Sequence, residues 1–528
     1  MHRLLISNAN ILPFHNAVKA GADTLCIEDN QFKAIGRWEE LQSLADNQTT
    51  IINAAGKTIM PGFNDTHIHI WKVGQLMTYM LDLRGISSKS EMLEVLLDYA
   101  KKNPDNIWLT ARGFNEAHWS DKSLPTKTDL DKLGIDRPVY VIRTCAHIAV
   151  CNSLALQKAG INNKTISPPG GEIRIGIDGQ PNGILTETAL GLITKHIPTA
   201  SGEQLRNMIL AAQQELLRLG ITAATDPAVD PLLLDTYMQM EAASELRLRI
   251  NALPILLPDG ASRPNPIPKK YESNFFRVNA VKFFSDGGLS GKTAALKKTY
   301  KDSTEKGILR LEKDLYTSLA TQAMKNELGV ATHAIGDDAI DFVIDVYTSL
   351  HEAFPHISNR IEHLGLPSRE NLAIMYKKKI AASMQSIFIH ELGNNFLSYL
   401  DETYLKKCYP IRSVVESGIL VSLSSDAPVV KNFNPLHGAY AAHSRKTIAG
   451  ERIAPQESVS LSTALSLYTS EAAKMSQIPH YGCIAPGYLA DFIMLNQNPL
   501  QAANNDVNAI HVTDTFINGK LAWSKAEK

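Results

Sequence analysis

The chain has 528 residues, of which 44% are hydrophobic and 20% are charged, values typical of a globular enzyme with a large core. The formal net charge of -1 argues against nucleic acid or an anionic membrane as a partner. No apolar run approaches the roughly 18 residues that a membrane span needs. The five cysteines are scattered and form no CxxC pair, so we expect neither a disulfide framework nor a thiolate zinc site. A reducing, cytoplasmic location is the resulting expectation.

The two ends of the chain share one sequence pattern. Residues 3–56 and 483–523 each contain short strands that alternate polar and apolar residues between turns. Neither end is large enough to bury a good core alone. The sequence therefore predicts one small composite β-sandwich made of residues 1–57 and 483–528. The start of the chain, residues 1–13, has the alternation of a strand and lacks the cleavage site of a signal peptide.

Residues 58–482 alternate predicted strands with predicted helices. Helical patterns lie, for example, at 204–219, 314–328 and 340–353. The eight predicted strands are 58–63, 221–225, 248–255, 278–284, 329–332, 359–361, 380–387 and 420–423. Alternating elements predict a parallel sheet, and eight units predict an α/β fold closed as a TIM (β/α)8 barrel.

A long insertion, residues 71–200, separates the first two predicted strands. It has its own Gly/Pro-rich segment at 167–183, and we expect it to be a subdomain, or lid, over the barrel mouth that sets substrate choice. A lid must bring polar groups to the mouth, which makes Arg112, Arg143 and His147 candidate substrate contacts. The alternative for both arginines is an ordinary surface ion pair.

A His-x-His motif follows the first predicted strand, as His67 and His69. Residues two apart in a strand point the same way, so both imidazoles can face one ion. Two unrelated histidines are the alternative. Trp71 follows two residues later and either lines the pocket or packs in a core.

Lys282 lies inside the apolar run at 278–284. A charged amine is costly to bury there. It either pairs with Asp286 or reacts, as a neutral amine, with CO2 to give a carbamate that bridges two cations.

Three further residues each end a predicted strand: His333, His363 and Asp426. Either histidine alone could be a satisfied, half-buried side chain, and Asp426 could cap a helix. The carboxyl ends of barrel strands meet at one face, where barrel enzymes build their sites. Four histidines, one lysine and one aspartate there suit one or two divalent ions, with Zn2+ favoured.

This set of residues resembles the amidohydrolase superfamily, and closely its branch with the N-substituted formamide deformylases and the YtcJ-like proteins. The resemblance covers nearly the whole chain. Its motifs are His67-x-His69 after Pro61-Gly62-Phe63, Lys282-x-x-x-Asp286-Gly287, His-Ala-Ile-Gly-Asp at 333–337, Glu362-His363, Ser425-Asp426-Ala427-Pro428 and the segment 482–491. In the insertion, Arg112-Gly113, Arg143, His147 and the segment 183–187 also resemble branch motifs.

The resemblance implies a composite sandwich with a barrel, a metal centre and hydrolysis of amide-type C–N bonds. It makes Asp426 a general base as well as a ligand. The implied ligands are His67, His69, a carboxylated Lys282, His333, His363 and Asp426.

Two positions depart from the pattern of the branch. Lys292 stands where the branch usually has arginine, and lysine cannot make arginine's bidentate contacts. Gln385-Ser386 stands where the branch often has Gln-Pro, which leaves His390 as an uncertain site residue.

The leading interpretation is thus a metal-dependent hydrolase of a small molecule, for which a homodimer is also possible. The alternatives are a non-catalytic or regulatory protein on the same scaffold and a metal-dependent isomerase or lyase, because fold and site do not set the reaction. The chain keeps every expected ligand, which favours an enzyme. Measurements of metal content and of substrate turnover would distinguish the hydrolase from the non-catalytic protein and from the isomerase or lyase.

Overall fold

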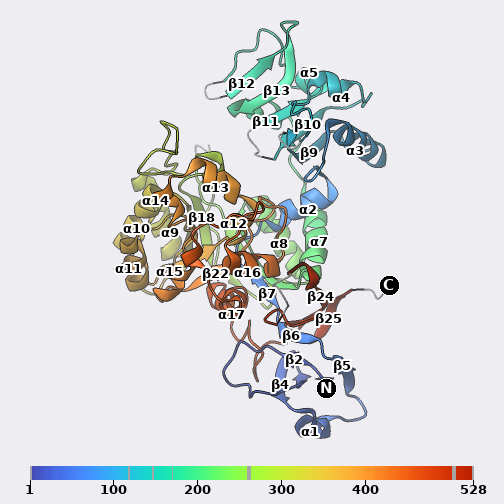
Figure 1. The fold of residues 1–528 in the computed structure, drawn as a ribbon, viewed down its shortest axis with the longest axis vertical. Helices are drawn as coiled ribbons and strands as arrows, with labels where there is room; N and C mark the ends of the chain where they lie inside the picture. The colour runs from blue at the N-terminus through green and yellow to red at the C-terminus, as the bar shows by residue number, and fades with distance from the viewer. Residues whose placement is uncertain are drawn as a thin grey trace. The chain divides into compact units, whose positions relative to one another are not determined.

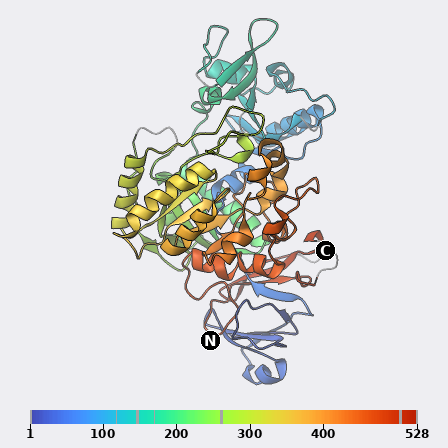
Figure 2. The same cartoon turned by 60° about the vertical axis from the view of Figure 1, so that its left-hand side comes forward.

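The computed structural model describes residues 3–116, 119–144, 148–168, 171–258, 263–501 and 507–525, and Figures 1 and 2 show its fold. It contains two compact units, one made of Met1–Ile70 with Gln213–Lys528 and the other of Trp71–Ala212. None of the described helices is both long enough and apolar enough to cross a membrane.

The larger unit contains eight strands in the predicted βα order. They lie in two sheets, with the strand orders β16-β17-β15-β14-β7 and β18-β19-β20-β21-β22. An isolated parallel β-bridge between Ile255 and Lys282 connects the two sheets. Neighbours among the eight pair in parallel within each sheet. The eight are β7 (Phe63–Asp65), β14 (Ile221–Val229), β15 (Arg249–Pro254), β18 (Ala280–Phe284), β19 (Gly329–Ala334), β20 (Arg360–His363), β21 (Ala381–Met384) and β22 (Val421–Leu423), and β16 (Tyr271–Glu272) and β17 (Phe276–Val278) lie beside β15.

Helices follow these strands and cover them, so the strands are buried on both faces. Every residue of β15, β20, β21 and β22 is buried. Side chains of two helices hold β19 in place, because the hydroxyls of Tyr316 and Tyr347 lie 2.7 and 2.8 Å from Thr332 Oγ1. The helices of the larger unit outside its terminal sheets include α8 (Pro231–Ala242), α9 (Lys313–Lys325), α10 (Asp337–His351), α11 (Arg369–Lys378), α12 (Ile387–Glu391), α13 (Gly393–Tyr399), α14 (Glu402–Leu405), α15 (Ile411–Glu416), α16 (Pro435–Ser444), α17 (Leu461–Ser466) and α18 (Ser470–Met475).

The first predicted strand, 58–63, is in fact two strands that belong to different sheets. β6 (Thr58–Pro61) pairs with Phe492–Leu495 of the chain's end, whereas β7 pairs with β14. Gly62 lies between them, and a Cβ there would come within 2.0 Å of Thr222 Oγ1. The chain can change sheets at this point because glycine permits such a close approach.

The terminal segments form two sheets. One has the order β4-β3-β1-β5, and the other, β2-β6-β23-β24-β25, combines strands from both ends of the chain, which lie side by side in Figures 1 and 2. Phe492 and Phe516 stack at 4.5 Å between ring centroids in a core that also contains Leu25 and Phe32. The elements are β1 (Leu4–Ser7), β2 (Asn10–Ile11), β3 (Thr24–Glu28), β4 (Gln31–Gly36), α1 (Trp38–Leu41), β5 (Thr50–Asn53), β6, β23 (Phe492–Leu495), β24 (Val512–Ile517) and β25 (Lys520–Ser524).

A buried ion pair ties β15 to the chain's end. Arg249 donates from Nε to Asp491 at 2.8 Å, and Asp491 also accepts the backbone N–H of Asn518. The two side chains are only 3% and 0% exposed.

Asp491→Asn should therefore destabilise the protein. The change leaves the Arg249 cation buried without its counter-charge, which typically costs about 3–5 kcal/mol. Urea denaturation should show this loss in the free energy of unfolding. Arg249→Met with Asp491→Leu removes both charges and should recover most of it. An Asp491→Asn midpoint equal to that of the wild type would contradict the prediction.

The second unit, Trp71–Ala212, has a sheet and a core of its own. Its sheet has the order β12-β13-β11-β10-β9-β8. One cluster contains Leu96 and Trp119, and another contains Trp108 and Tyr140. The elements are β8 (Leu81–Asp82), α3 (Lys89–Lys102), β9 (Leu109–Phe114), α4 (Lys127–Asp131), β10 (Val139–Arg143), β11 (Ile148–Cys151), α5 (Ser153–Lys158), β12 (Gly171–Ile175), β13 (Pro181–Glu187) and α6 (Gly191–Thr194), while α2 (Ile70–Thr78) and α7 (Gly202–Arg218) lie at its two ends.

Candidate metal centre

The segments that follow β7 and β22 are joined by hydrogen bonds. The Asp65 carboxylate accepts the backbone N–H groups of His67 and Ser425, at 3.2 and 3.1 Å. The N–H of Asp426 bonds to the carbonyl of His67 at 2.7 Å, and that of His69 to the carbonyl of Ala427. These bonds place the His-x-His motif beside Asp426, although the two parts are far apart in the sequence.

His67, His69 and Asp426 form a compact group of buried side chains. Each offers one ligand atom, and these atoms all lie within 4.8 Å of one another. The Nε2 atoms of His67 and His69 lie 3.5 and 3.3 Å from Asp426 Oδ1. Burial lowers the pKa of His67 to about 4, so its imidazole is neutral near pH 7, as a metal ligand must be.

The donor set of this group fits a divalent cation. His67 donates its Nδ1–H to Glu362, so its Nε2 carries a lone pair, and Nε2 lies 3.5 Å from Asp426 Oδ1. Two electron-rich atoms at this distance repel each other unless a cation or a proton lies between them. Imidazole and carboxylate are the donors that borderline ions such as Zn2+ prefer.

Of the other two predicted histidines, His363 lies next to this group and His333 lies next to His363. The ring centroid of His363 is 4.8 Å from that of His67 and 4.3 Å from that of His333. Burial, with His333 and His67 close by, lowers the pKa of His363 well below its ordinary value. His333 donates Nε2–H to the carbonyl of Gly287 at 3.0 Å, which leaves its lone pair on Nδ1.

Lys282 is fully buried, and its Nζ has no hydrogen-bond partner among the described residues, although it lies 4.7 Å from the centroid of the Phe284 ring. The sequence left a pair between Lys282 and Asp286 as the alternative. The Asp286 carboxylate instead accepts the backbone N–H groups of Ala295, Ile335 and Gly336. Burial lowers the pKa of Lys282 to about 8, against the opposing effect of nearby carboxylates. A buried amine without a hydrogen-bond partner is costly to keep charged, so the neutral form of Lys282 is more populated near pH 7 than that of an ordinary lysine.

Two residues of the centre were not picked out as site residues from the sequence. Glu362 accepts from His67 Nδ1 at 2.5 Å, and Gln385 Oε1 accepts from His363 Nδ1 at 2.6 Å. One signal was present for Glu362, since Arg360 and Glu362 are two charged residues two apart in a short buried strand. Gln385 was marked only as part of Gln385-Ser386, the segment where the branch often has Gln-Pro.

The predicted substrate contacts fall in several places. Trp71 lies in the first turn of α2 and is half-buried, and Arg112 lies in β9. Arg143 forms an ion pair with Glu116 at 2.8 Å, and this pair is partly buried, unlike the surface pair considered from the sequence. His390 is half-buried in α12 and bonds through Nδ1 to the carbonyl of Lys446 at 3.2 Å. His147 lies outside the described residues.

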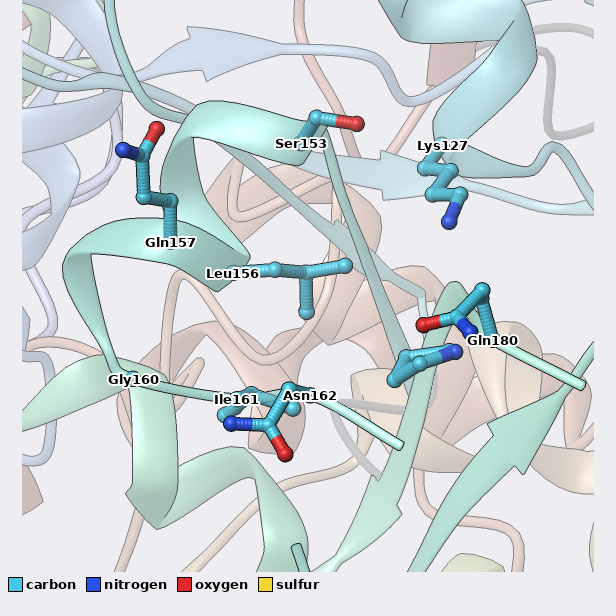
Figure 3. Close-up of a pocket in the computed structure, with 9 residues that line it drawn as sticks. Lys127, Ser153, Leu156, Gln157, Gly160, Ile161, Asn162 and Gln180 are labelled. Atoms are coloured by element: carbon cyan, nitrogen blue, oxygen red, sulfur yellow. The ribbon is translucent and has the colours of Figure 1, made fainter. Parts of the chain in front are cut away.

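A separate pocket in the second unit contains none of the predicted site residues. Its volume is about 360 Å³, and Figure 3 shows Lys127 and Gln180 on one side of it and Gln157 on the other. Lys127 is the one ionisable side chain among its lining residues, and acid–base chemistry needs more than that. The lining of this pocket therefore offers no acid–base pair.

A solved structure resembles the whole chain. It is an uncharacterized metal-dependent hydrolase from Pyrococcus horikoshii, with a TM-score of 0.79 and 24% identity, and the match covers 95% of this chain and 98% of that one. This likeness shows a TIM-barrel-type α/β fold, as the alternation of strands and helices predicts.

Two relatives match over almost their full length. The putative amidohydrolase YtcJ of Bacillus subtilis is 28% identical over 96% of each chain. The N-substituted formamide deformylase of Arthrobacter pascens is 25% identical over 99% of each chain. The family model described as the amidohydrolase family matches residues 50–522, nearly the whole chain. This protein, with its buried histidines and aspartate at the ends of parallel strands, therefore belongs to the amidohydrolase family.

Proposed function

We propose that this protein is a metal-dependent hydrolase that cleaves a C–N bond, of the amide or formamide type, in a small molecule. The observation that carries the proposal is the group of His67, His69 and Asp426, whose ligand atoms lie within 4.8 Å of one another. Family membership supports hydrolysis. The name of the deformylase relative supports the formamide-type bond. We further propose that the eight parallel strands close into a barrel and that the terminal sheets form one composite sandwich.

The ligands of the proposed centre are His67, His69, His333, His363, Asp426 and a carboxylated Lys282. A bound divalent ion lowers the pKa of water toward 7 and polarises the carbonyl under attack. We favour Zn2+, as one or two ions, because imidazole nitrogens dominate the donor set.

Asp426 is the proposed general base. Its Oδ1 lies 3.5 and 3.3 Å from the Nε2 atoms of His67 and His69, and this closeness to two proposed ligands supports the role. The carboxylate takes one proton from the water and passes it to the leaving nitrogen, which is a poor leaving group until it is protonated. One group can do both because the two transfers occur in sequence. Helix capping, the alternative considered from the sequence, is performed by another residue, since the N-cap of the following helix, α16, is Asn434.

Lys282 is the proposed site of carboxylation. Its neutral Nζ attacks CO2, forms an N–C bond and loses a proton, which gives a carbamate anion able to bridge two cations. The buried Nζ, which has no hydrogen-bond partner in the described part of the chain, supports this role.

Lys282→Ala should lower kcat/KM by about 10²–10³-fold, since several kcal/mol of metal-derived stabilisation would be lost. Short carboxylic acids such as acetate should restore part of the activity, because they can replace the missing carbamate. Labelling with 13C-bicarbonate should give a carbamate resonance in the wild type that the variant lacks. An unmodified Lys282 in a metal-loaded crystal structure would remove carboxylation from the proposal.

The proposed function is tested by elemental analysis of the purified protein with a substrate screen. The screen should contain formamides, N-acyl amino acids and cyclic amides. We expect a divalent metal together with release of an amine from at least one class. The absence of both metal and turnover would overturn the proposal. Metal together with turnover that is not hydrolytic would favour an isomerase or lyase.

A further inference from the structure

We propose that Glu362, held by Arg360, is a positioning residue that sets the ring orientation and tautomer of His67 for metal binding. This inference rests on the proposed function, because it concerns how one ligand of the metal centre is prepared.

The contact between Glu362 and His67 is short and fully enclosed. Glu362 Oε2 accepts from His67 Nδ1 at 2.5 Å, and the two side chains are 0% and 1% exposed. A carboxylate in such a place costs several kcal/mol unless it is paired.

Arg360 supplies the pairing and also reaches the backbone of the motif. Its Nε donates to Glu362 Oε1 at 2.5 Å, and its Nη2 donates to the carbonyl of Thr66 at 3.2 Å. Arg360 and Glu362 lie two apart in β20, so their side chains point the same way. One guanidinium thus connects the carboxylate that holds the His67 ring with the peptide group that precedes His67.

This arrangement decides which nitrogen of His67 is available. A carboxylate only accepts hydrogen bonds, so His67 must carry its proton on Nδ1 and its lone pair on Nε2. Nε2 faces Asp426 and the other ligand atoms. An anionic acceptor also makes the imidazole a stronger donor to a metal, and loss of such an outer partner typically costs about 10–100-fold in metal affinity.

The structure contains a natural comparison for this effect. The neighbouring His363 is held in the same manner, by its Nδ1, but its acceptor is the neutral amide of Gln385. That amide is oriented by its own donation from Nε2 to Ser424 Oγ at 2.8 Å. The charged acceptor belongs to His67, and Glu362→Gln would give His67 the kind of partner that His363 already has.

The experiment measures Co2+ binding to the full-length protein by competition with a chelator, and records the visible absorption of the bound Co2+. Glu362→Gln should raise the Kd for Co2+ by about 10–100-fold and shift the absorption bands, because the donor strength of one ligand changes. Asp491→Asn is the matched control, since it breaks another buried Arg–carboxylate pair, with side chains 3% and 0% exposed, away from the centre. It should lower stability without changing the Kd or the spectrum.

Glu362→Gln leaves the Arg360 cation buried, and the variant could fail to fold for that reason alone. Arg360→Met with Glu362→Gln removes both charges, and Glu362→Asp keeps the carboxylate. We expect the double variant to bind Co2+ weakly although it folds, and the aspartate variant to recover part of the affinity. Wild-type affinity and spectrum in a folded Glu362→Gln or double variant would overturn the positioning role. Failure of the wild type to bind Co2+ would instead overturn the proposed function.

Discussion

Replacement of both His67 and His69 by alanine should strip the divalent metal from the protein and abolish hydrolysis. Two of the three mutually close ligand atoms would be lost. The remaining proposed ligands, Asp426 with His333, His363 and Lys282, would then lack the motif that completes the centre. A catalytic metal supplies several kcal/mol of stabilisation, so we expect kcat/KM to fall by about 10³-fold or more. Elemental analysis and steady-state kinetics on the same preparation measure both effects.

His356→Ala is the control for this pair of substitutions. The His356 side chain is 60% exposed and interacts with Glu327, so it should affect neither metal content nor activity. A His67→Ala/His69→Ala protein with its full metal content would show that the ligands have been assigned incorrectly. Full activity without metal would show that the chemistry does not depend on the ion.

Asp426→Asn should lower kcat by at least about 10²-fold while the fold survives, because the loss of a general base typically costs about 10²–10⁴ in rate. Asparagine keeps the shape of the side chain, but its amide cannot take a proton from water. The loss would be larger if the carboxylate also holds the metal. Measurements of kcat, metal content and Tm on one variant separate these contributions.

A residue with a purely structural role would give a different pattern. Loss of a structural hydrogen bond would lower Tm and leave kcat unchanged, which would remove Asp426 from the mechanism. Ser425→Ala is a useful companion, because Ser425 is also buried at this strand end and its Oγ accepts the N–H of Ala427. It should lower Tm without a comparable loss of kcat.

The sequence by itself determined the order of the elements and the residues at the strand ends. The apolar runs predicted the eight strands because parallel strands under helices are buried on both faces, and β15, β20 and β22 lie within or next to the predicted runs. His67, His333 and Asp426 could be picked out because a polar side chain directly after a buried run needs a reason to be there. These patterns involve residues that are neighbours in the chain, so they can be recognised in a single sequence.

The details of the site depended on contacts between distant parts of the chain. The division of the run at 58–63 into two strands follows from the approach of Thr222 to Gly62, and the run at 380–387 ends at Met384, where α12 soon follows. The hydrogen bond from His67 to Glu362 spans 295 residues. Which nitrogen of a histidine carries its proton, and whether a buried lysine has a partner, depend on the groups that surround it in space. Local sequence does not specify those neighbours. The tertiary structure alone therefore decided the partners of His67 and left the Nζ of Lys282 without a hydrogen bond to any described residue.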